Sequence, residues 1–250
     1  MSTPDRLAVW TTYQSAWSAI PDAERRDRLA RSVASDCAYA DPQTELQGLE
    51  ALVEKIAQSQ AATPGASFRN DRLTDYGDQA LSEWTMLGPK GERLVQGASH
   101  ARFGADGRLT RMTGFFRRPG SPDGPQDPTP AARNWDVYQA AWARVSAAQR
   151  RSLLAAALDA AAVYADPGGA KTGLEALGAY IDATQDKAPG VWFRQTLFLE
   201  HHGQALSRWE RLTPDGEPPV RGASYARFAP DGRVLQMSGF PNSVPEGDVG

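Results

Sequence analysis

The chain has 250 residues, of which 41% are hydrophobic and 23% charged, and this is the composition of an ordinary soluble protein. Its net charge of −3 argues against nucleic acid as a partner, because nucleic-acid binding needs a basic surface and the short pairs Arg25-Arg26 and Arg117-Arg118 are expected to be solvated. The single cysteine, Cys37, excludes an internal disulfide framework, and with no apolar run of transmembrane length and no signal-peptide core in the polar N-terminus we expect a cytoplasmic protein without a membrane partner.

Helical spacing of large apolar residues, interrupted by turn signals that contain proline, dominates the first quarter of the chain. Trp10, Tyr13 and Trp17 fall on one face of a helix that Pro21 ends, and Asp22 can cap a second helix. A short strand then ends at an Asp-Pro pair, and a third helix stops before a Pro-Gly pair. The expected elements are a first helix through residues 10–20, a second helix at 23–35, a strand at 37–40 and a third helix at 49–60.

The segment after the third helix alternates with period two between turn signals rich in Gly and Asp. Four strands are expected there, at residues 67–75, 80–87, 93–103 and 109–116. Helices that come first and a mostly antiparallel sheet that follows give an α+β order.

The whole pattern occurs twice, at a constant offset of 125 residues and without a gap. Trp10 recurs as Trp135, the Tyr-Ala-Asp-Pro of residues 39–42 recurs at 164–167, and more than two in five of the paired positions are identical. A period this long indicates whole domains in tandem rather than a solenoid. The expected organisation is a first domain at 7–117, a Pro/Gly-rich linker at 118–132, a second domain at 133–242 and a flexible tail at 243–250.

A family resemblance rests on four features that both halves share. They are the Tyr-x-Asp-Pro strand end, Gly-Leu-Glu-Ala-Leu at the third helix, a strand that bears Trp, and Asp-Gly-Arg before a final Gly-Phe strand. Together they resemble the SnoaL-like branch of the NTF2-like superfamily. The resemblance implies two cone-shaped α+β domains, each with about three helices packed on a curved, mostly antiparallel sheet around an apolar pocket. Because members commonly dimerise through their sheets, we expect an intramolecular pseudo-dimer, alone or within a higher oligomer.

The same resemblance implies that Asp41 and Asp166 are the catalytic residues. In ketosteroid isomerase the general base is the Asp of a Glu-Asp-Pro segment at this point of the fold, and the segments here read Ala-Asp-Pro. Desolvation at the mouth of an apolar pocket suits a carboxylate to shuttle a proton next to a carbonyl. The alternative stays open, because Asp-Pro also simply ends a strand and starts a turn.

Ser99 and its counterpart in the second half stand where, by resemblance, ketosteroid isomerase has the acid of its oxyanion hole. A serine can still donate a hydrogen bond, although it cannot act as a strong acid; the alternative is a small residue that makes room in the pocket. The oxyanion-hole tyrosine of that enzyme aligns with Trp17 and Trp142, and a shift of one turn brings Tyr13 and Tyr138 there. We expect these aromatic residues to pack the core, with a pocket hydroxyl as the alternative.

Alternation along the strands groups the residues of one side of each sheet, and the resemblance implies that this side is the concave, pocket-facing one. His100 and Tyr225 fall on the opposite side, where interface or surface residues are expected. The halves differ where specificity would lie, among other places at Leu46/Lys171, Lys55/Tyr180, Ser67/Trp192 and Phe116/Pro241. The expected pocket residues are Tyr13, Trp17, Trp84, Ser99, Met112 and Phe116 in the first half and Tyr138, Trp142, Trp209, Ser224 and Met237 in the second.

These features predict an isomerase or polyketide cyclase that needs no cofactor and acts on a small hydrophobic carbonyl or polycyclic substrate, with an Asp general base. The alternative is a noncatalytic protein that binds a small hydrophobic ligand. A lower-ranked alternative, a limonene-type epoxide hydrolase, needs an Asp-Arg-Asp set, and although Arg69 and Arg194 exist a second pocket Asp is not evident. No metal is expected: His201 and His202 sit at a hairpin turn, and because adjacent residues on a strand point to opposite faces the pair is poorly placed to chelate one metal.

Overall fold

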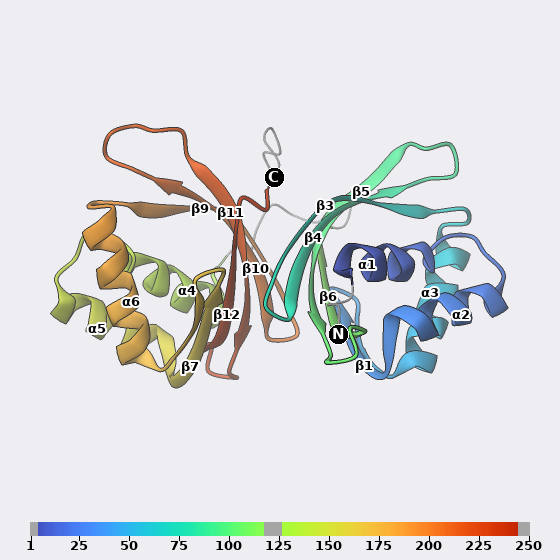
Figure 1. Cartoon of the computed structure of the whole chain (residues 1–250), viewed down its shortest axis with the longest axis horizontal. Helices are drawn as coiled ribbons and strands as arrows, with labels where there is room; N and C mark the ends of the chain where they lie inside the picture. Colours follow the sequence, from blue (N-terminus) through green and yellow to red (C-terminus); the bar gives the residue numbers. More distant parts are fainter. Residues whose placement is uncertain (1–4, 118–126, 245–250) are drawn as a thin grey trace. The chain divides into compact units, whose positions relative to one another are not determined.

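The computed structural model describes residues 5–117 and 127–244. The chain divides into two compact units, Met1–Ser121 and Pro122–Gly250 (Figure 1). In each unit helices pack on a mostly antiparallel sheet, which confirms the predicted α+β class and two domains in tandem. Residues 118–126 of the predicted linker and 245–250 of the predicted tail lie outside the described residues, and the predicted domain boundaries stay a prediction.

The helices of the first unit lie against one face of its sheet (Figure 1). The first begins where the Asp5 carboxylate accepts hydrogen bonds from the backbone N–H groups of Leu7 and Ala8, which have no partner inside the helix. The third follows Gly48, whose φ of 92° turns the chain sharply out of the strand hairpin. The helices are α1 (Arg6–Ser15), α2 (Asp22–Ser32) and α3 (Leu49–Ala62).

The described strands of the first unit form one sheet in the order β2-β1-β6-β5-β4-β3. The pair β1 and β6 is parallel, and the other neighbours are antiparallel. Because β6 returns to lie between β1 and β5, the end of β1 at Asp41 comes next to Gly114 on β6, and Gly114 pairs with Ser99 on β5. The strands are β1 (Val33–Asp41), β2 (Thr44–Gln47), β3 (Ser67–Tyr76), β4 (Gln79–Leu87), β5 (Arg93–Phe103) and β6 (Leu109–Phe116).

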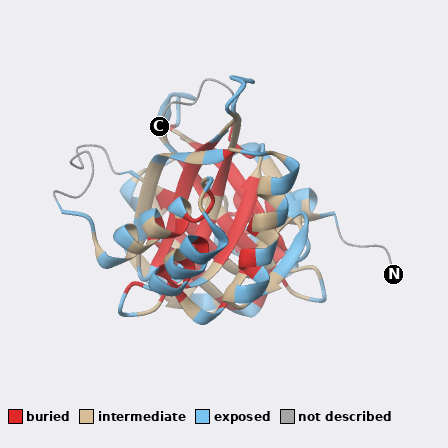
Figure 2. Ribbon diagram, turned by 90° about the vertical axis from the view of Figure 1, so that its left-hand side faces the viewer, coloured by how far each residue is buried: buried red, intermediate tan, exposed pale blue. Residues whose placement is uncertain are grey.

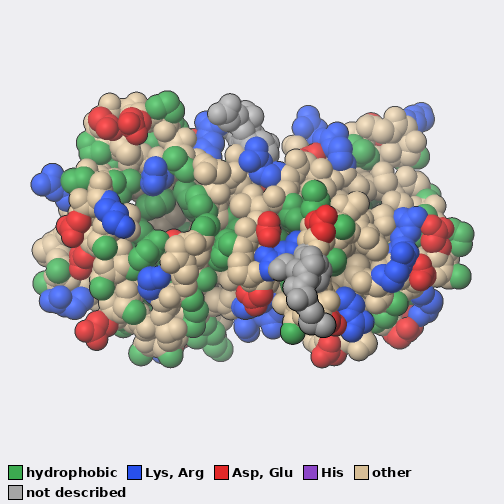
Figure 3. Space-filling view, in the orientation of Figure 1, with side chains coloured by type: hydrophobic (Ala, Val, Ile, Leu, Met, Phe, Trp, Pro, Cys, Tyr) green, Lys and Arg blue, Asp and Glu red, His purple; other side chains and the backbone are tan. Residues whose placement is uncertain are grey.

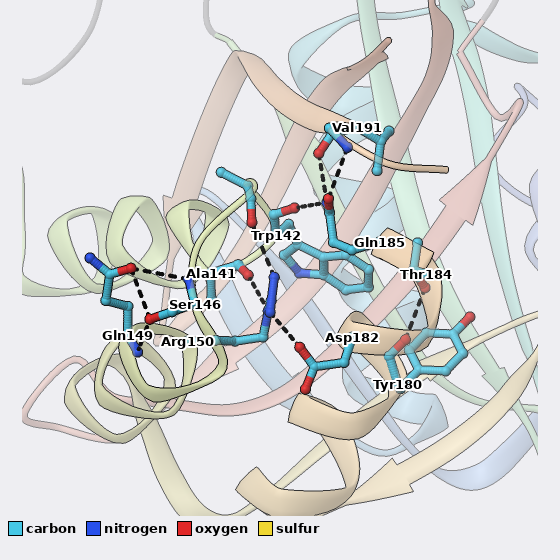
Figure 4. Close-up of polar contacts among 12 residues, drawn as sticks. Ala141, Trp142, Ser146, Gln149, Arg150, Tyr180, Asp182, Thr184, Gln185 and Val191 are labelled. Atoms are coloured by element: carbon cyan, nitrogen blue, oxygen red, sulfur yellow. Dashed lines mark hydrogen bonds and ion pairs between the residues drawn. The ribbon is translucent and has the colours of Figure 1, made fainter. Parts of the chain in front are cut away.

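The second unit repeats this fold, with the sheet order β8-β7-β12-β11-β10-β9 and β7 parallel to β12. Its second helix opens on a capping box in which the side chains of Ser146 and Gln149 bond each other's backbone N–H groups (Figure 4). No helix within the described ranges is long and apolar enough to cross a membrane. The elements are α4 (Pro130–Ala140), α5 (Ala147–Ala157), β7 (Leu158–Asp166), β8 (Gly169–Thr172), α6 (Leu174–Lys187), β9 (Trp192–His201), β10 (Gln204–Leu212), β11 (Val220–Phe228) and β12 (Val234–Pro241).

The structure corrects the boundary between the second predicted helix and the first predicted strand. Helix α2 ends at Ser32, and β1 begins at Val33, whose φ and ψ of −125° and 140° are extended. Val33 is β-branched, pairs with Leu109 on β6 and is fully buried, so the sheet holds it in the conformation that its side chain favours. The short strand β2, which was not predicted, forms a hairpin with β1.

The core of each unit lies between the helices and the sheet. In the first unit Trp10 of α1, Leu29 of α2, Leu52 and Ile56 of α3 and Leu109 of β6 are almost completely buried. Figure 2 views the second unit from its helix side, and there buried residues cover the sheet behind helices whose outward faces are exposed. Burial of each large apolar side chain stabilises the fold by about 2 kcal/mol, so these contacts fix the helices on the sheet.

A buried arginine holds the end of the first helix in each unit. Arg150 donates from Nε to the carbonyl oxygen of Ala141 and from a terminal nitrogen to that of Ala143, and it pairs with Asp182 on α6 (Figure 4). Arg25 makes the equivalent backbone bonds at the end of α1. Because Arg25 is buried, the prediction that it is solvated is wrong: its guanidinium replaces water at helix carbonyls that have no partner within the helix.

A glutamine in the third helix of each unit fixes the same helix end from the other side. Gln185 on α6 donates to the carbonyl oxygens of Trp142 and Val191, at 2.6 and 2.7 Å (Figure 4). Gln60 on α3 makes the equivalent bonds in the first unit, where Trp17 supplies one of the carbonyls. These bonds tie the tryptophan at the end of the first helix to the third helix and to the start of the next strand.

His100 and Tyr225 occupy equivalent places on β5 and β11, and both are buried rather than exposed; their predicted role as interface residues stays a prediction. Tyr225 donates its phenol proton to Gln204 Oε1 at 2.6 Å, and His100 Nε2 lies 3.0 Å from Gln79 Oε1. Burial, together with the charges of two nearby arginines, holds the pKa of His100 well below its ordinary value. The imidazole therefore stays neutral and is a structural counterpart of the tyrosine.

Candidate functional site

A cavity lies in the first unit between the helices and the face of the sheet that they cover. Its volume is about 610 Å³, which is within the range of small-molecule sites. Tyr13 comes from α1, Trp17 from the turn that follows α1, Lys55 from α3 and Asp41 from β1. Strands β3 to β6 contribute, among others, Phe68, Trp84, Ser99, Gly114 and Phe116.

A continuous run of aromatic rings forms one wall of this cavity. The ring centroids of Tyr39 and Trp17 are 5.6 Å apart, and those of Trp17 and Phe68 are 5.7 Å apart. Trp84 continues the run at 5.3 Å from Phe68 and 5.9 Å from Phe116. Most of these contacts are edge-to-face, the arrangement that aromatic quadrupoles favour, so the wall is stiff and suits a flat apolar molecule.

The strand register places a tryptophan over a glycine and against a serine. Trp84 on β4 pairs with Gly97 on β5, and its indole covers that glycine: a Cβ added there would lie 2.4 Å from the ring. The indole Nε1 therefore reaches Ser99 Oγ, two residues along β5, and donates a hydrogen bond of 2.9 Å. An indole can only donate, so Ser99 accepts, and its own proton remains for another acceptor in the cavity.

A second hydroxyl in the cavity, that of Tyr13, also accepts a hydrogen bond from an indole. Trp17 forms a side-chain hydrogen bond with Tyr13 one turn earlier on the helix, and here too the indole donates and the phenol oxygen accepts. Burial, with the charge of Asp41 as a lesser cause, raises the pKa of Tyr13. The phenol therefore keeps its proton and, like Ser99, has it available for a ligand.

The Asp41 carboxylate accepts three hydrogen bonds and forms one ion pair. Its Oδ1 accepts from the backbone N–H groups of Gln43 and Thr44, at 2.8 and 3.0 Å, and so caps the turn between β1 and β2. Its Oδ2 accepts from the Tyr39 phenol at 3.0 Å and forms an ion pair with Lys55 Nζ, also at 3.0 Å. Burial and the charge of Asp41 raise the pKa of Tyr39 well above its ordinary value, so the phenol stays a donor. A carboxylate has about four lone-pair sites; three accept hydrogen bonds here, and the ammonium of Lys55 lies beside Oδ2.

The ammonium of Lys55 lies at this carboxylate and at the cavity. Its side chain is 14% exposed and that of Asp41 is 4% exposed, so the ion pair is buried on both sides. Among the described residues, Asp41 is the partner of the Lys55 ammonium. Two of its three N–H groups are thus left for water or a ligand.

The second unit replaces the ion pair by a pair of phenols. Asp166 Oδ2 accepts from Tyr164 at 2.8 Å and from Tyr180 at 2.6 Å, and Oδ1 accepts from the backbone N–H of Gly168 at 2.7 Å. Tyr180 on α6 stands at the position of the lysine in the first unit. Burial and the hydrogen bond to Asp166 raise the pKa of Tyr180, which keeps the phenol protonated.

The donor arrangement of the first unit recurs in the second. Trp209 Nε1 donates to Ser224 Oγ at 3.0 Å, and Trp142 bonds the phenol of Tyr138. Gly222 again lies under the indole, with a Cβ there 2.5 Å from the ring. Figure 3 shows a hollow lined by hydrophobic side chains on the face of the second unit that it presents.

The structure brings most of the predicted site residues of the first half to one cavity. Asp41, Tyr13, Trp17, Trp84, Ser99 and Phe116 all line it. Met112 is not among the residues that line this cavity, and Met112 and Met237 lie in the cores of their units, where each is 1% exposed. The contacts of Tyr39 and Lys55 with Asp41 were not predicted. Tyr39 could have been found from its spacing, since residues two apart on a strand share a face.

The two histidines of the second unit lie closer together than predicted. His201 ends β9, and His202 takes a φ of 49° in the turn that follows. This turn brings the Nδ1 atoms of the two rings to 3.0 Å, so the argument that adjacent strand residues diverge is wrong for this pair. Across residues 5–117 and 127–244, no group of three or more His, Cys, Asp and Glu side chains is arranged to hold a metal ion.

Comparisons with known proteins identify a family for the first half. Residues 11–112 match the family profile of the SnoaL-like domain. No curated protein matches the chain. Among solved structures, a candidate isomerase of the SnoaL-like family from Agrobacterium tumefaciens is 22% identical over 45% of this chain and 97% of its own, with a TM-score of 0.43.

Two further solved structures are similar to parts of the chain. A candidate polyketide cyclase from Sinorhizobium meliloti is 20% identical over 44% of this chain and 98% of its own, with a TM-score of 0.37. A candidate hydroxylase from Streptomyces galilaeus is 15% identical over 50% of this chain and 91% of its own, with a TM-score of 0.37.

Proposed function

Because the chain carries a SnoaL-like domain of the NTF2-like fold, repeated in its second half, we propose that each domain binds a flat apolar molecule with an oxygen acceptor such as a ketone. The aromatic wall supplies the apolar contacts. Ser99 and Tyr13 supply O–H donors to the ligand oxygen in the first unit, and Ser224 and Tyr138 do so in the second.

The observation that carries this proposal is the direction of the tryptophan hydrogen bonds. Trp84 and Trp17 can only donate, and each meets a hydroxyl oxygen in the cavity. Each hydroxyl proton then lacks an acceptor among the described residues, and a buried donor without an acceptor costs about 1–3 kcal/mol. A ligand oxygen that accepts from both hydroxyls removes this cost.

Binding of two probes of the same shape tests the proposal. We expect 2-acetylnaphthalene, a ketone, to bind about tenfold more tightly than 2-ethylnaphthalene, which lacks the oxygen, because it gains hydrogen bonds that together are worth about 1–2 kcal/mol. Isothermal titration calorimetry on the full chain measures both affinities. In the Ser99→Ala, Ser224→Ala double variant the preference for the ketone should shrink. Equal affinity of the wild type for both probes would count against an oxygen-recognising site.

A second candidate function is proton transfer, as in a cofactor-independent isomerase or cyclase with an Asp general base. The observation that favours it is the difference between the two carboxylates. Three hydrogen bonds and the ammonium of Lys55 surround Asp41, whereas Asp166 accepts three hydrogen bonds without such an ammonium and keeps one lone-pair site for a substrate proton. Asp166 is therefore the better placed of the two for this role.

Deuterium exchange at the methyl group of 2-acetylnaphthalene tests this second function, since a general base next to a bound ketone takes up α-protons. In D₂O we expect the wild-type chain to accelerate exchange above the buffer rate, Asp166→Asn to abolish the acceleration and Asp41→Asn to retain it. Mass spectrometry of the ketone follows the exchange. Acceleration that persists in the double variant removes both carboxylates as candidate bases.

Epoxide hydrolysis of the limonene type gains no support from the side chains present. Arg69 pairs with Asp71 and Arg194 pairs with Glu210, and these arginine side chains are 61% and 63% exposed. Among the described residues that line the first cavity, Asp41 is the sole aspartate. An Asp-Arg-Asp set is thus not assembled there.

A further inference from the structure

The pocket carboxylate has a charged partner in the first unit and a neutral partner in the second. In the first, Lys55 places an ammonium 3.0 Å from Asp41 Oδ2. In the second, the equivalent residue Tyr180 donates a phenol proton to Asp166 Oδ2 at 2.6 Å. An ammonium cancels the charge of its partner, whereas a phenol leaves that charge in place. The two cavities therefore differ in the potential that a ligand meets.

The first cavity gathers several donors and one cation around Asp41. Lys55 keeps two N–H groups beyond the one that meets Asp41, and Ser99 and Tyr13 each keep an O–H. Asp41, the acidic residue of the lining, is surrounded by three hydrogen bonds and the ammonium of Lys55. The ligand group that satisfies several donors and one cation together is a carboxylate, which offers about four lone-pair sites and a negative charge.

We propose that the first cavity binds a flat apolar molecule that carries a carboxylate, and that the residue at position 55, or 180 in the second unit, determines this charge selectivity. The inference rests on the proposed function and narrows it to an anionic ligand class in one of the two cavities. In the first unit the ligand anion accepts from Lys55 beside an ion pair with no net charge. In the second unit the anion meets the uncancelled charge of Asp166, and like charges a few ångströms apart repel.

Lys171, a cation beside Tyr180 in the second unit, forms no ion pair with Asp166 among the described residues and does not restore the arrangement of the first unit. Its Nζ lies 4.6 Å from the centroid of the Tyr180 ring and 3.4 Å from the carbonyl oxygen of Ala170. The Tyr180 phenol donates its hydrogen bond to Asp166, so it has no further proton to donate to a ligand anion. The second cavity accordingly suits a neutral ligand.

An exchange of the two residues between the units tests the inference. Isothermal titration calorimetry on the full chain compares 2-naphthoate with the neutral ketone 2-acetylnaphthalene at pH 7. For the wild type we expect one 2-naphthoate and two ketone molecules per chain. Lys55→Tyr places in the first unit the residue that the second unit has at this position, so Asp41 keeps a hydrogen-bond donor. Binding of 2-naphthoate should weaken by at least about tenfold, because the ligand loses a charged hydrogen bond. Tyr180→Lys should create a second 2-naphthoate site.

A conservative variant and the ketone probe separate the outcomes. Lys55→Arg keeps the cation and should retain 2-naphthoate binding, and ketone binding by Lys55→Tyr shows that the cavity is intact. If the ketone binds at both sites but Lys55→Tyr leaves the 2-naphthoate affinity unchanged, the charge selectivity is overturned and the proposed function is not. Absence of ketone binding in the wild type overturns the proposed function instead.

Discussion

Gly97→Ala is expected to lower the free energy of unfolding by about 3 kcal/mol, because the added methyl group overpacks a site that is already filled. Its Cβ would lie 2.4 Å from the Trp84 ring and 2.6 Å from the carbonyl oxygen of Phe115, and the backbone atom cannot move aside as a flexible side chain can. Displacement of the indole would also break its hydrogen bond to Ser99. Urea denaturation measures the loss, and near-ultraviolet circular dichroism reports the displaced ring.

Two further glycines serve as the match and the control for this prediction. Gly222→Ala makes the same close approach in the second unit, 2.5 Å from the Trp209 ring, and should cost about as much. Gly114→Ala lies in the same sheet, but its Cβ would make ordinary contacts of 3.6 Å with Ser99 Oγ, so its effect on stability should be small. Equal stability of the Gly97 and Gly114 variants would show that the indole does not depend on the glycine.

Arg25→Met is expected to destabilise the first unit by about 3–5 kcal/mol. The change keeps an apolar stem of similar length but removes the donors that three backbone carbonyls at the end of α1 share, from Ala16, Ser18 and Ile20. The first of these residues is fully buried, so water does not readily replace the guanidinium. Thermal and urea unfolding monitored by far-ultraviolet circular dichroism check the loss.

The neighbouring Arg26 provides the control for this substitution. Arg26 pairs with Glu50 at the surface, where solvent screens the pair, so Arg26→Met should leave stability close to that of the wild type. Arg150→Met repeats the experiment in the second unit and should resemble Arg25→Met. A result in which Arg25→Met and Arg26→Met behave alike would contradict the structural role of the buried guanidinium.

The repeat and the order of elements could be predicted from sequence because both depend on local patterns. Trp10 and Trp135 mark the two first helices, and the turn signals separate the later strands at positions close to those observed. The boundary at Val33 could not be predicted, since its extended conformation comes from pairing with Leu109, far away in the chain. The same holds for Arg25, whose charge predicts exposure until the carbonyls that surround it are known.

The residues that line the candidate site could mostly be predicted from sequence, but the hydrogen bonds and ion pairs among them could not. Alternation along the strands assigns Trp84 and Ser99 to one face, yet the hydrogen bond between them depends on the register of β4 on β5. The spacing of the sequence likewise marks Lys55 and Tyr180 as a difference between the halves. That each of them meets the pocket carboxylate requires the third helix to be packed on the sheet.

A crystal structure of the chain with 2-acetylnaphthalene tests the central claim most directly. The account predicts that the naphthalene rings lie against the wall formed by Trp17, Phe68 and Trp84, and that the ketone oxygen accepts hydrogen bonds from Ser99 Oγ and the Tyr13 phenol. A probe bound outside the cavity, or bound inside it with its oxygen turned away from both hydroxyls, would contradict the account.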